Sequence, residues 1–362
     1  MKRFILILAA LFCGIAINIS GNAQAQKRWR KPTAPKVRTQ ASSRVAPRER
    51  RFEFEYKATI KEIPAGARKV DLWIPIPHDT PFQKITGLKI DSPHPYRLHT
   101  AEYGNRILHL SLNNPPPPSS GLSVTMSFNA ERIEHIQGRL RHAAAPVPSE
   151  ERDPHMSRWL QPDRLVPIDG KVRQWAQEVV DAVGAKTDLE RARAIYNHVV
   201  STVKYDKSGQ GWGRGDIYYA CDARRGNCTD FHAIFIGYCR ALGIPARFAI
   251  GFPLPADRGA GQVSGYHCWA EFYAEGIGWV PVDASEAAKD PARREYFFGA
   301  HDENRVEFTT GRDLVLNPKQ QGMPLNYFIY PYAEADGRAL EAVERSFTYR
   351  DVRRGITNGG RE

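Results

Sequence analysis

The sequence predicts an α+β protein in which an all-β sandwich precedes a domain of helices and strands. From residue 52 to about 133, apolar residues alternate with polar ones, as in strands that bury one face. After residue 165 the apolar spacing becomes helical, and strand-like segments return after residue 245. We therefore expect a sandwich at residues 52–133, a polar linker at 134–165 and a mixed domain at 166–300. Residues 301–362 are expected to form a C-terminal extension.

The first 25 residues have the pattern of a secretory signal peptide. Two basic residues follow Met1, an apolar run extends from Phe4 to Ile19, and Ala23-Gln24-Ala25 forms a cleavage signal. A membrane anchor is less favoured because the apolar run is short, and a lipid on Cys13 is less favoured because bulky Phe12 precedes it. We expect cleavage after Ala25, a periplasmic or secreted product and no stable membrane insertion afterwards.

The positive charge of the chain is confined to its beginning. Lys and Arg number 51 against 40 Asp and Glu, a formal net charge of +11. Residues 1–25 carry +2 and residues 26–51 carry +9, so the remainder is neutral overall. The segment 26–51 is rich in Pro, Ser and Arg and predicts a disordered basic linker. Because the folded part has no excess of basic residues, we expect no nucleic-acid partner.

Four alternating segments indicate the strands of the sandwich. They are broken by turns at Pro64-Ala65-Gly66, at Gly104-Asn105 and at the prolines 115–118. No group of catalytic residue types occurs among them. The apolar residues of the four segments are Phe52, Phe54 and Tyr56; Val70, Leu72, Ile74 and Ile76; Ile107, Leu108, Leu110 and Leu112; and Leu122, Val124, Met126 and Phe128.

Helical spacing follows in the mixed domain. One helix runs from Val172 to a C-terminal Gly184, and the next begins with the capping box Thr187–Glu190. A third begins after the glycine-rich residues 209–215. Its spaced residues are Cys228, Phe231, His232, Phe235, Ile236, Cys239 and Leu242.

Cys228 lies in the first turn of the third helix, and three roles compete for it. It could be a small buried residue, a metal ligand or disulfide partner, or a nucleophile. Unpaired backbone N–H groups and the helix dipole favour the thiolate at this position, whereas simple burial better fits Cys239, deep in the helix.

Two further residues complete a possible catalytic set. Residues 246–252 and 267–273 read as strands, and Gly276–Gly278 turns the chain into a strand that ends at Asp283. A thiol, a histidine and a carboxylate are the ingredients of a nucleophile, its base and the group that orients the base. We expect these roles for Cys228, His267 and Asp283.

Three blocks in this order resemble the transglutaminase-like (papain-like cysteine) superfamily over about residues 170–285. They are GNCTDFHAIFIGYCRALGIPARFAIGF, GYHCWAEFY and GIGWVPVDASEA. The resemblance implies a nucleophile helix packed on an antiparallel sheet, and it carries the catalytic cysteine, histidine and aspartate onto Cys228, His267 and Asp283. The superfamily includes cross-linking enzymes, peptidases, deamidases, peptide N-glycanases and inactive scaffolds.

The other candidate residues receive more modest roles. Asp230 suits the helix N-terminus, and His232 is expected to pack or to donate a hydrogen bond near the site. An oxyanion donor beside the Cys228 amide could be Trp212, Tyr218 or Tyr219. The sequence does not choose among these three.

Four cysteines remain once Cys13 is removed with the leader, and if Cys228 stays free the other three allow one disulfide. The pairing we favour is Cys221 with Cys268, which leaves Cys239 buried. A zinc site from Cys221, Cys228, His267 and Cys268 is the alternative, although these spacings are not those of common structural zinc motifs. We expect no cofactor and no metal.

The expected function is that of an exported cysteine enzyme acting on amide bonds of peptides or proteins, such as cell-wall peptides. The thiolate would form a thioester, which water would hydrolyse or an amine would intercept. The alternative is a non-catalytic envelope protein that uses the same domains as a binding scaffold. The presence of Cys228, His267 and Asp283 together argues for the enzyme.

Overall fold

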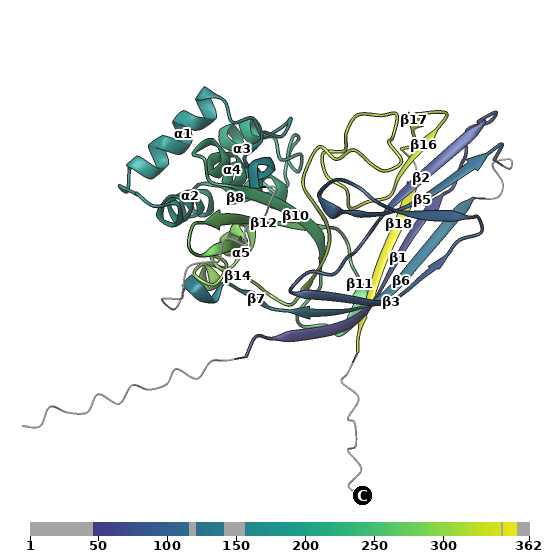
Figure 1. The fold of residues 1–362 in the computed structure, drawn as a ribbon, viewed down its shortest axis with the longest axis horizontal. Coiled ribbons are helices and arrows are strands. Elements are labelled where there is room, and N and C mark those ends of the chain that lie inside the picture. The colour runs from purple at the N-terminus through teal and green to yellow at the C-terminus, as the bar shows by residue number, and fades with distance from the viewer. Residues whose placement is uncertain (1–45, 116–120, 141–155, 342, 353–362) are drawn as a thin grey trace, which may run out of the picture. The chain divides into compact units, whose positions relative to one another are not determined.

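The computed structural model describes residues 46–115, 121–140, 156–341 and 343–352 (Figure 1). The predicted signal peptide and the basic linker up to residue 45 lie outside the described residues. Residues Ala46–Glu362 form one compact unit. Within the described residues, no helix is both long enough and apolar enough to cross a membrane.

Two five-stranded antiparallel sheets form the predicted sandwich. The first has the order β11-β18-β1-β6-β3 and the second the order β17-β16-β2-β5-β4. The strands of the first sheet are β1 Glu49–Ile60, β3 Gln83–Asp91, β6 Leu122–Ile133, β11 Ala260–Gln262 and β18 Val343–Asp351. Those of the second are β2 Lys69–Ile76, β4 Tyr96–Thr100, β5 Arg106–Asn113, β16 Tyr332–Ala335 and β17 Arg338–Ala339.

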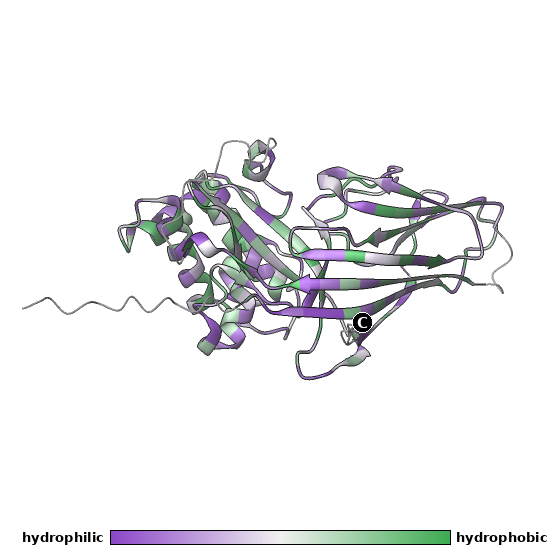
Figure 2. Cartoon of the chain, turned by 60° about the horizontal axis from the view of Figure 1, so that its bottom comes forward, coloured by the Kyte–Doolittle hydropathy of each residue, from purple (hydrophilic) through white to green (hydrophobic). Residues whose placement is uncertain are grey.

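Buried apolar and exposed charged side chains alternate along β1, so one face of the strand packs into the sandwich core. Phe52, Phe54 and Tyr56 are buried, whereas the charged residues between them are exposed. Hydrophobic and hydrophilic bands alternate along several of the sandwich strands (Figure 2). Burial of large apolar side chains on one face is the main stabilising term for such a sheet.

β1 begins earlier than the sequence analysis placed it. The predicted basic linker ends at residue 51, but Glu49, Arg50 and Arg51 already belong to β1. Arg50 is buried because its guanidinium donates to Asp351 at 2.9 Å and to Asn304 at 2.8 Å. The charge of Arg50, which the composition placed in a disordered basic linker, is therefore paired inside the fold.

The C-terminal residues complete the sandwich, which corrects the predicted division of the chain. The sequence predicted a sandwich that ends at residue 133 and a separate C-terminal extension at residues 301–362. In the structure, β18 pairs with β1 from Ile60↔Val343 to Phe52↔Asp351, and β16 pairs with β2. Without β18, the long strand β1 would be a free edge.

The mixed domain has a four-stranded antiparallel sheet of order β13-β12-β10-β15, covered by helices on one face (Figure 1). Its strands are β10 Ala246–Pro253, β12 His267–Ala274, β13 Gly278–Val282 and β15 Arg305–Thr310. The helices are α1 Gly170–Asp181, α2 Asp188–Thr202, α3 Ile217–Ala223, α4 Cys228–Ala241 and α5 Ala284–Lys289. This is the nucleophile-helix-on-sheet arrangement that the sequence predicted.

Every residue of α4 is buried, which makes it the central helix of the domain. It contacts β12, β10 and helices α1, α2, α3 and α5. A helix that is apolar on nearly all sides is typical of such a position. The sheet beneath it also extends the sandwich core, because Phe252 of β10 and Phe308 of β15 contact Phe54 of β1.

Short elements connect these parts. The strands β7 His135–Ile136 and β14 Ala300–His301 form an antiparallel pair, and β8 Lys204–Tyr205 and β9 Arg225–Gly226 a parallel pair. The 3-10 helices are η1 Glu102–Gly104, η2 Gly138–Leu140, η4 Met156–Leu160 and η5 Pro291–Arg293. The predicted linker at 134–165 thus contains β7, η2 and η4 in its described part.

Candidate active site

The N-terminus of α4 is fixed by a capping box. The Asn227 side chain accepts from Thr229 N at 2.9 Å, and Asp230 accepts from Asn227 N at 2.9 Å. Asp230 also accepts from Gly213 N at 2.7 Å and Gly215 N at 3.0 Å. The structural role expected for Asp230 is therefore to tie the glycine-rich loop to the start of the helix.

The site needs a glycine immediately before Asn227. A Cβ on Gly226 would lie 2.2 Å from Asp230 Oδ2, inside the carboxylate that accepts these three amides. The absence of a side chain at Gly226 therefore allows the loop to approach the helix. That approach sets the position of Cys228 two residues later.

His267 and Asp283 meet because β12 and β13 are antiparallel. His267 begins β12 and Asp283 directly follows β13, so the two residues lie at the same end of the strand pair. His267 Nε2 lies 2.7 Å from Asp283 Oδ2. The other carboxylate oxygen accepts from Ser285 Oγ and Glu286 N, each at 3.1 Å, which caps α5.

Cys228 completes this group, because the side chains of Cys268 and His267 act on its thiol. Burial opposes ionisation of the Cys228 thiol, but Cys268 and the positive charge of His267 hold its pKa well below the usual range. Burial likewise disfavours charged His267, yet Asp283 and Cys228 raise the pKa of His267 to about 10. The arrangement favours a thiolate–imidazolium pair at neutral pH.

A buried arginine that the sequence analysis missed holds the carboxylate. Arg305 Nη1 of β15 donates to Asp283 Oδ2 at 3.0 Å, and the same guanidinium donates to Asp302 Oδ1 at 3.2 and 3.3 Å. Despite burial, the charges of His267 and Arg305 hold the pKa of Asp283 well below its usual range. Nothing in the sequence near Arg305 indicates this contact, because β15 reaches the site only through its pairing with β10.

His232 is buried beside the site, where one ring nitrogen accepts a hydrogen bond and the other, which bears the proton of the neutral ring, faces a thiol. Its Nε2 accepts from Ala284 N at 3.2 Å, and its Nδ1 lies 3.7 Å from Cys268 Sγ. Burial lowers the pKa of His232, in keeping with a neutral ring. The ring thus fixes the backbone directly after Asp283.

The three predicted oxyanion donors have other environments. Trp212 Nε1 donates to Gly209 O at 3.2 Å, the Tyr218 hydroxyl donates to Asp169, and Tyr219 packs against Gly211. A different aromatic residue, Tyr266, places its hydroxyl 3.0 Å from Asn227 Nδ2 and 2.8 Å from Thr229 Oγ1. In the sequence, only its position directly before His267 indicates that Tyr266 lies near the site.

The favoured disulfide is wrong, since Cys221, Cys228, Cys239 and Cys268 are all free thiols. Cys268 Sγ lies 3.7 Å from Thr229 Oγ1, whereas Cys221 Sγ lies 3.4 Å from the Tyr238 hydroxyl. Thr229 and Tyr238 are separated by about 13 Å along α4, which is too far for one disulfide to bridge. Among the described residues, the clusters able to hold a metal contain no cysteine, so the cysteine zinc site also fails.

Comparisons with known proteins agree with this fold. Residues 173–284 match the model of the transglutaminase-like superfamily. The chain is 28% identical over 325 residues to an uncharacterized Haemophilus influenzae protein, covering 79% of this chain and 87% of the relative. The structure of a proposed cysteine protease from Cytophaga hutchinsonii has the same fold, with a TM-score of 0.58 at 16% identity over 86% of this chain and 93% of that one.

Proposed function

We propose that this chain, whose residues 173–284 match the transglutaminase-like superfamily, is a cysteine enzyme that cleaves or transfers amide bonds through a thioester. The observation that carries the proposal is the contact of Cys228 with His267, which lies 2.7 Å from Asp283. A scaffold has no physical need for a buried thiolate beside an imidazolium.

The Cys228 thiolate attacks the amide carbonyl carbon and forms a carbon–sulfur bond. The Cys228 backbone N–H, in the first turn of α4, has no intrahelical acceptor and donates to the developing oxyanion. Imidazolium His267 gives its proton to the leaving nitrogen as the carbon–nitrogen bond breaks, which yields a thioester and a free amine. Neutral His267 then takes a proton from water or from an acceptor amine, which attacks the thioester and releases Cys228.

Asp283 and its partners orient the base in this scheme. Asp283 fixes the imidazole so that its other nitrogen faces Cys228 and stabilises the imidazolium form. Arg305 Nη1 donates to the same oxygen of Asp283, Oδ2, at 3.0 Å. Peptides or proteins outside the cytoplasm are the proposed substrates, on the basis of the signal-peptide pattern in residues 1–25.

The activity test compares wild type with Cys228→Ala and Asp283→Ala on a panel of peptide amides, with and without a primary amine. Cys228→Ala should abolish turnover, and Asp283→Ala should leave a residue of activity after a loss of up to roughly 10⁴-fold. Cys239→Ala is the matched control, because that thiol lies deep in α4. Equal turnover by folded Cys228→Ala would refute the nucleophile, and no turnover of any amide by the wild type would favour the scaffold.

N-terminal sequencing of the protein from its native host tests the proposed location. A mature N-terminus at Gln26 is expected from the Ala23-Gln24-Ala25 pattern. Retained Met1 or a lipid on Cys13 would contradict cleavage at this site.

A further inference from the structure

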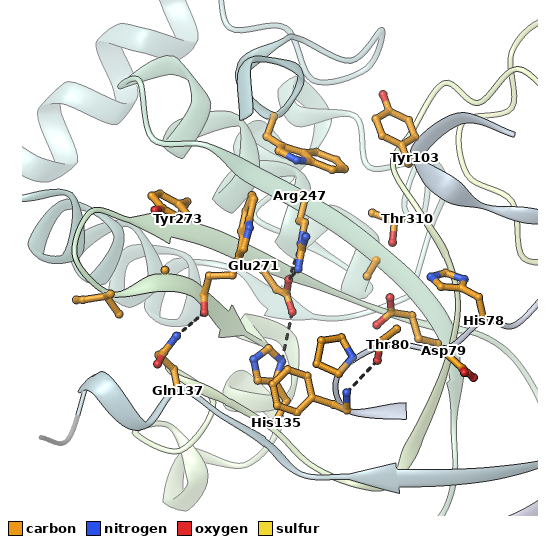
Figure 3. Close-up of a pocket in the computed structure, with 18 of the residues that line it drawn as sticks. His78, Asp79, Thr80, Tyr103, His135, Gln137, Arg247, Glu271, Tyr273 and Thr310 are labelled. Carbon is orange, nitrogen blue, oxygen red and sulfur yellow. Dashed lines mark hydrogen bonds and ion pairs between the residues drawn. The ribbon is translucent and has the colours of Figure 1, made fainter. Parts of the chain in front are cut away.

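A second polar cluster lies on the face of the catalytic sheet opposite α4. Side chains alternate along β12, so Phe272 packs against Phe235 of α4, while Glu271 and Tyr273 line a cavity of about 500 Å³ on the other face. His135 and Arg247 line the same cavity, and Figure 3 shows both close to Glu271. None of these four residues has a role in the proposed reaction.

Three potential metal ligands from three strands converge beside this cavity, and two of them, His135 and Glu271, line it. His135 of β7 and His301 of β14 are directly opposed in the antiparallel pair, and Glu271 comes from β12. Their ligand atoms all lie within 4.8 Å of one another. His135 Nδ1 and Glu271 Oε1 are 3.3 Å apart, close to the separation of two tetrahedral ligands with bonds of about 2.0–2.1 Å.

The third ligand, His301, packs its ring edge-on against His135 and Trp269. Its side chain is fully buried, and neither ring nitrogen has a hydrogen-bond partner among the described residues. A buried polar group without a partner destabilises a fold.

Glu271 pairs with an arginine through one carboxylate oxygen and keeps the other for an ion. Arg247 Nε donates to Oε2 at 2.5 Å, which leaves Oε1 facing His135. Arg247 thus orients the carboxylate as a hydrogen-bonding partner behind a ligand does.

We propose that His135, Glu271 and His301 bind one Zn²⁺ ion whose remaining coordination position opens toward the cavity. Two imidazoles and a carboxylate are a ligand set that zinc accepts, with a water or an anionic group in the fourth position. The ion ties β7 and β14 to β12. It lies on the opposite face of the sheet from Cys228, so its binding does not depend on amide turnover.

Metal content of the purified full-length chain tests the site. The protein is treated with chelator, supplied with Zn²⁺ and desalted, and the metal is counted by mass spectrometry. Wild type should hold one ion per chain, and the zinc should raise its melting temperature. His301→Leu and His135→Gln should each weaken zinc binding by more than about 10-fold and remove this thermal shift.

Two control variants separate this site from other histidines. His267→Ala removes the cluster of His267, Asp283 and Glu286 beside Cys228, and His109→Ala removes a histidine paired with Asp71 in the sandwich. Both should retain the ion. Loss of zinc in His267→Ala would assign the ion to the catalytic cysteine region and overturn the proposal.

Two further results would also overturn it. One is a wild type that holds no zinc above background. The other is unchanged zinc affinity in folded His301→Leu. Should His301→Leu not fold, Glu271→Gln decides, because it removes the anionic ligand while keeping an oxygen for Arg247. Co²⁺ substitution adds a spectroscopic readout, since its visible absorption should change in Glu271→Gln and not in His267→Ala.

Discussion

Three buried thiols surround the core of the mixed domain, and their neighbours decide which one ionises. Burial raises the pKa of Cys239, which lies deep in α4. Burial and the adjacent Cys228 raise the pKa of Cys268 well above its usual range. The Cys228 thiol faces His267 and has its pKa lowered instead. The position of each thiol relative to the His267 imidazolium therefore affects its pKa more than burial does.

Alkylation should follow this difference. Cys228 should react with iodoacetamide well below pH 9, the rate rising as the thiol ionises, while Cys239 stays unreactive at neutral pH. His267→Ala removes the positive partner, so the rate profile of Cys228 should move to higher pH. Mass spectrometry of the labelled thiols at several pH values measures both. Preferential labelling of Cys239, or an unmoved profile in His267→Ala, would contradict the thiolate–imidazolium pair.

Arg305 should contribute to stability as well as to orientation. It is 2% exposed and pairs with Asp283 and Asp302, so Arg305→Met removes a buried cation from both carboxylates and leaves them only His267 and Arg293 as positive partners. The free energy of unfolding should fall by about 3–5 kcal/mol, measured by urea denaturation. Arg350→Met is the control, because Arg350 pairs with Glu53 on the surface and should change little. An equal effect of the two substitutions would contradict a buried role for Arg305.

At the scale of elements, the start of α4 depends on a close approach of loop and helix. Gly226→Ala places a Cβ against Asp230 and should destabilise the protein by about 1–3 kcal/mol. It should also slow alkylation of Cys228 by displacing the first turn. Gly170→Ala, where a Cβ meets nothing within 4 Å, is the matched control in thermal unfolding. Unchanged stability of Gly226→Ala would show that the loop adjusts freely.

The sequence predicted those residues of the site whose positions follow from local helix and strand patterns. Helical spacing placed Cys228 in the first turn of its helix, and the predicted strands placed His267 and Asp283 near their strand ends. Arg305 escaped prediction because its partner is 22 residues away and the contact requires β15 to pair with β10. The disulfide prediction failed for the same reason, since spacing alone does not reveal that α4 separates Cys221 from Cys268.

At the scale of the whole molecule, the two ends of the described chain share one sheet. The alternation of Val343, Phe347 and Tyr349 is visible in the sequence, but which sheet they join depends on long-range pairing with β1. The sandwich and the catalytic sheet also share a core through Phe54 and Phe252. Division of the chain at residues 133 and 301 missed both connections.

Removal of residues 343–362 should therefore abolish cooperative unfolding of the whole unit. It deletes β18 from between β11 and β1 and exposes Phe52, Phe54 and Tyr56. Removal of residues 353–362 alone keeps β18 and should leave the thermal transition near that of the full chain. Circular dichroism and melting of both proteins measure this. A cooperative transition in the chain that lacks β18 would refute the dependence.

The pairing of β1 with β18 also sets an order of events during synthesis. Ribosomes make β1 among the first described residues and β18 among the last, so β1 lacks one neighbour until nearly the whole chain has been translated. Such distant pairing is slow, and waiting strands are prone to aggregate. Glu53, Glu55 and Lys57 alternate on the exposed face of β1. Charges of this kind keep an unpaired strand from joining another copy before its own partner arrives.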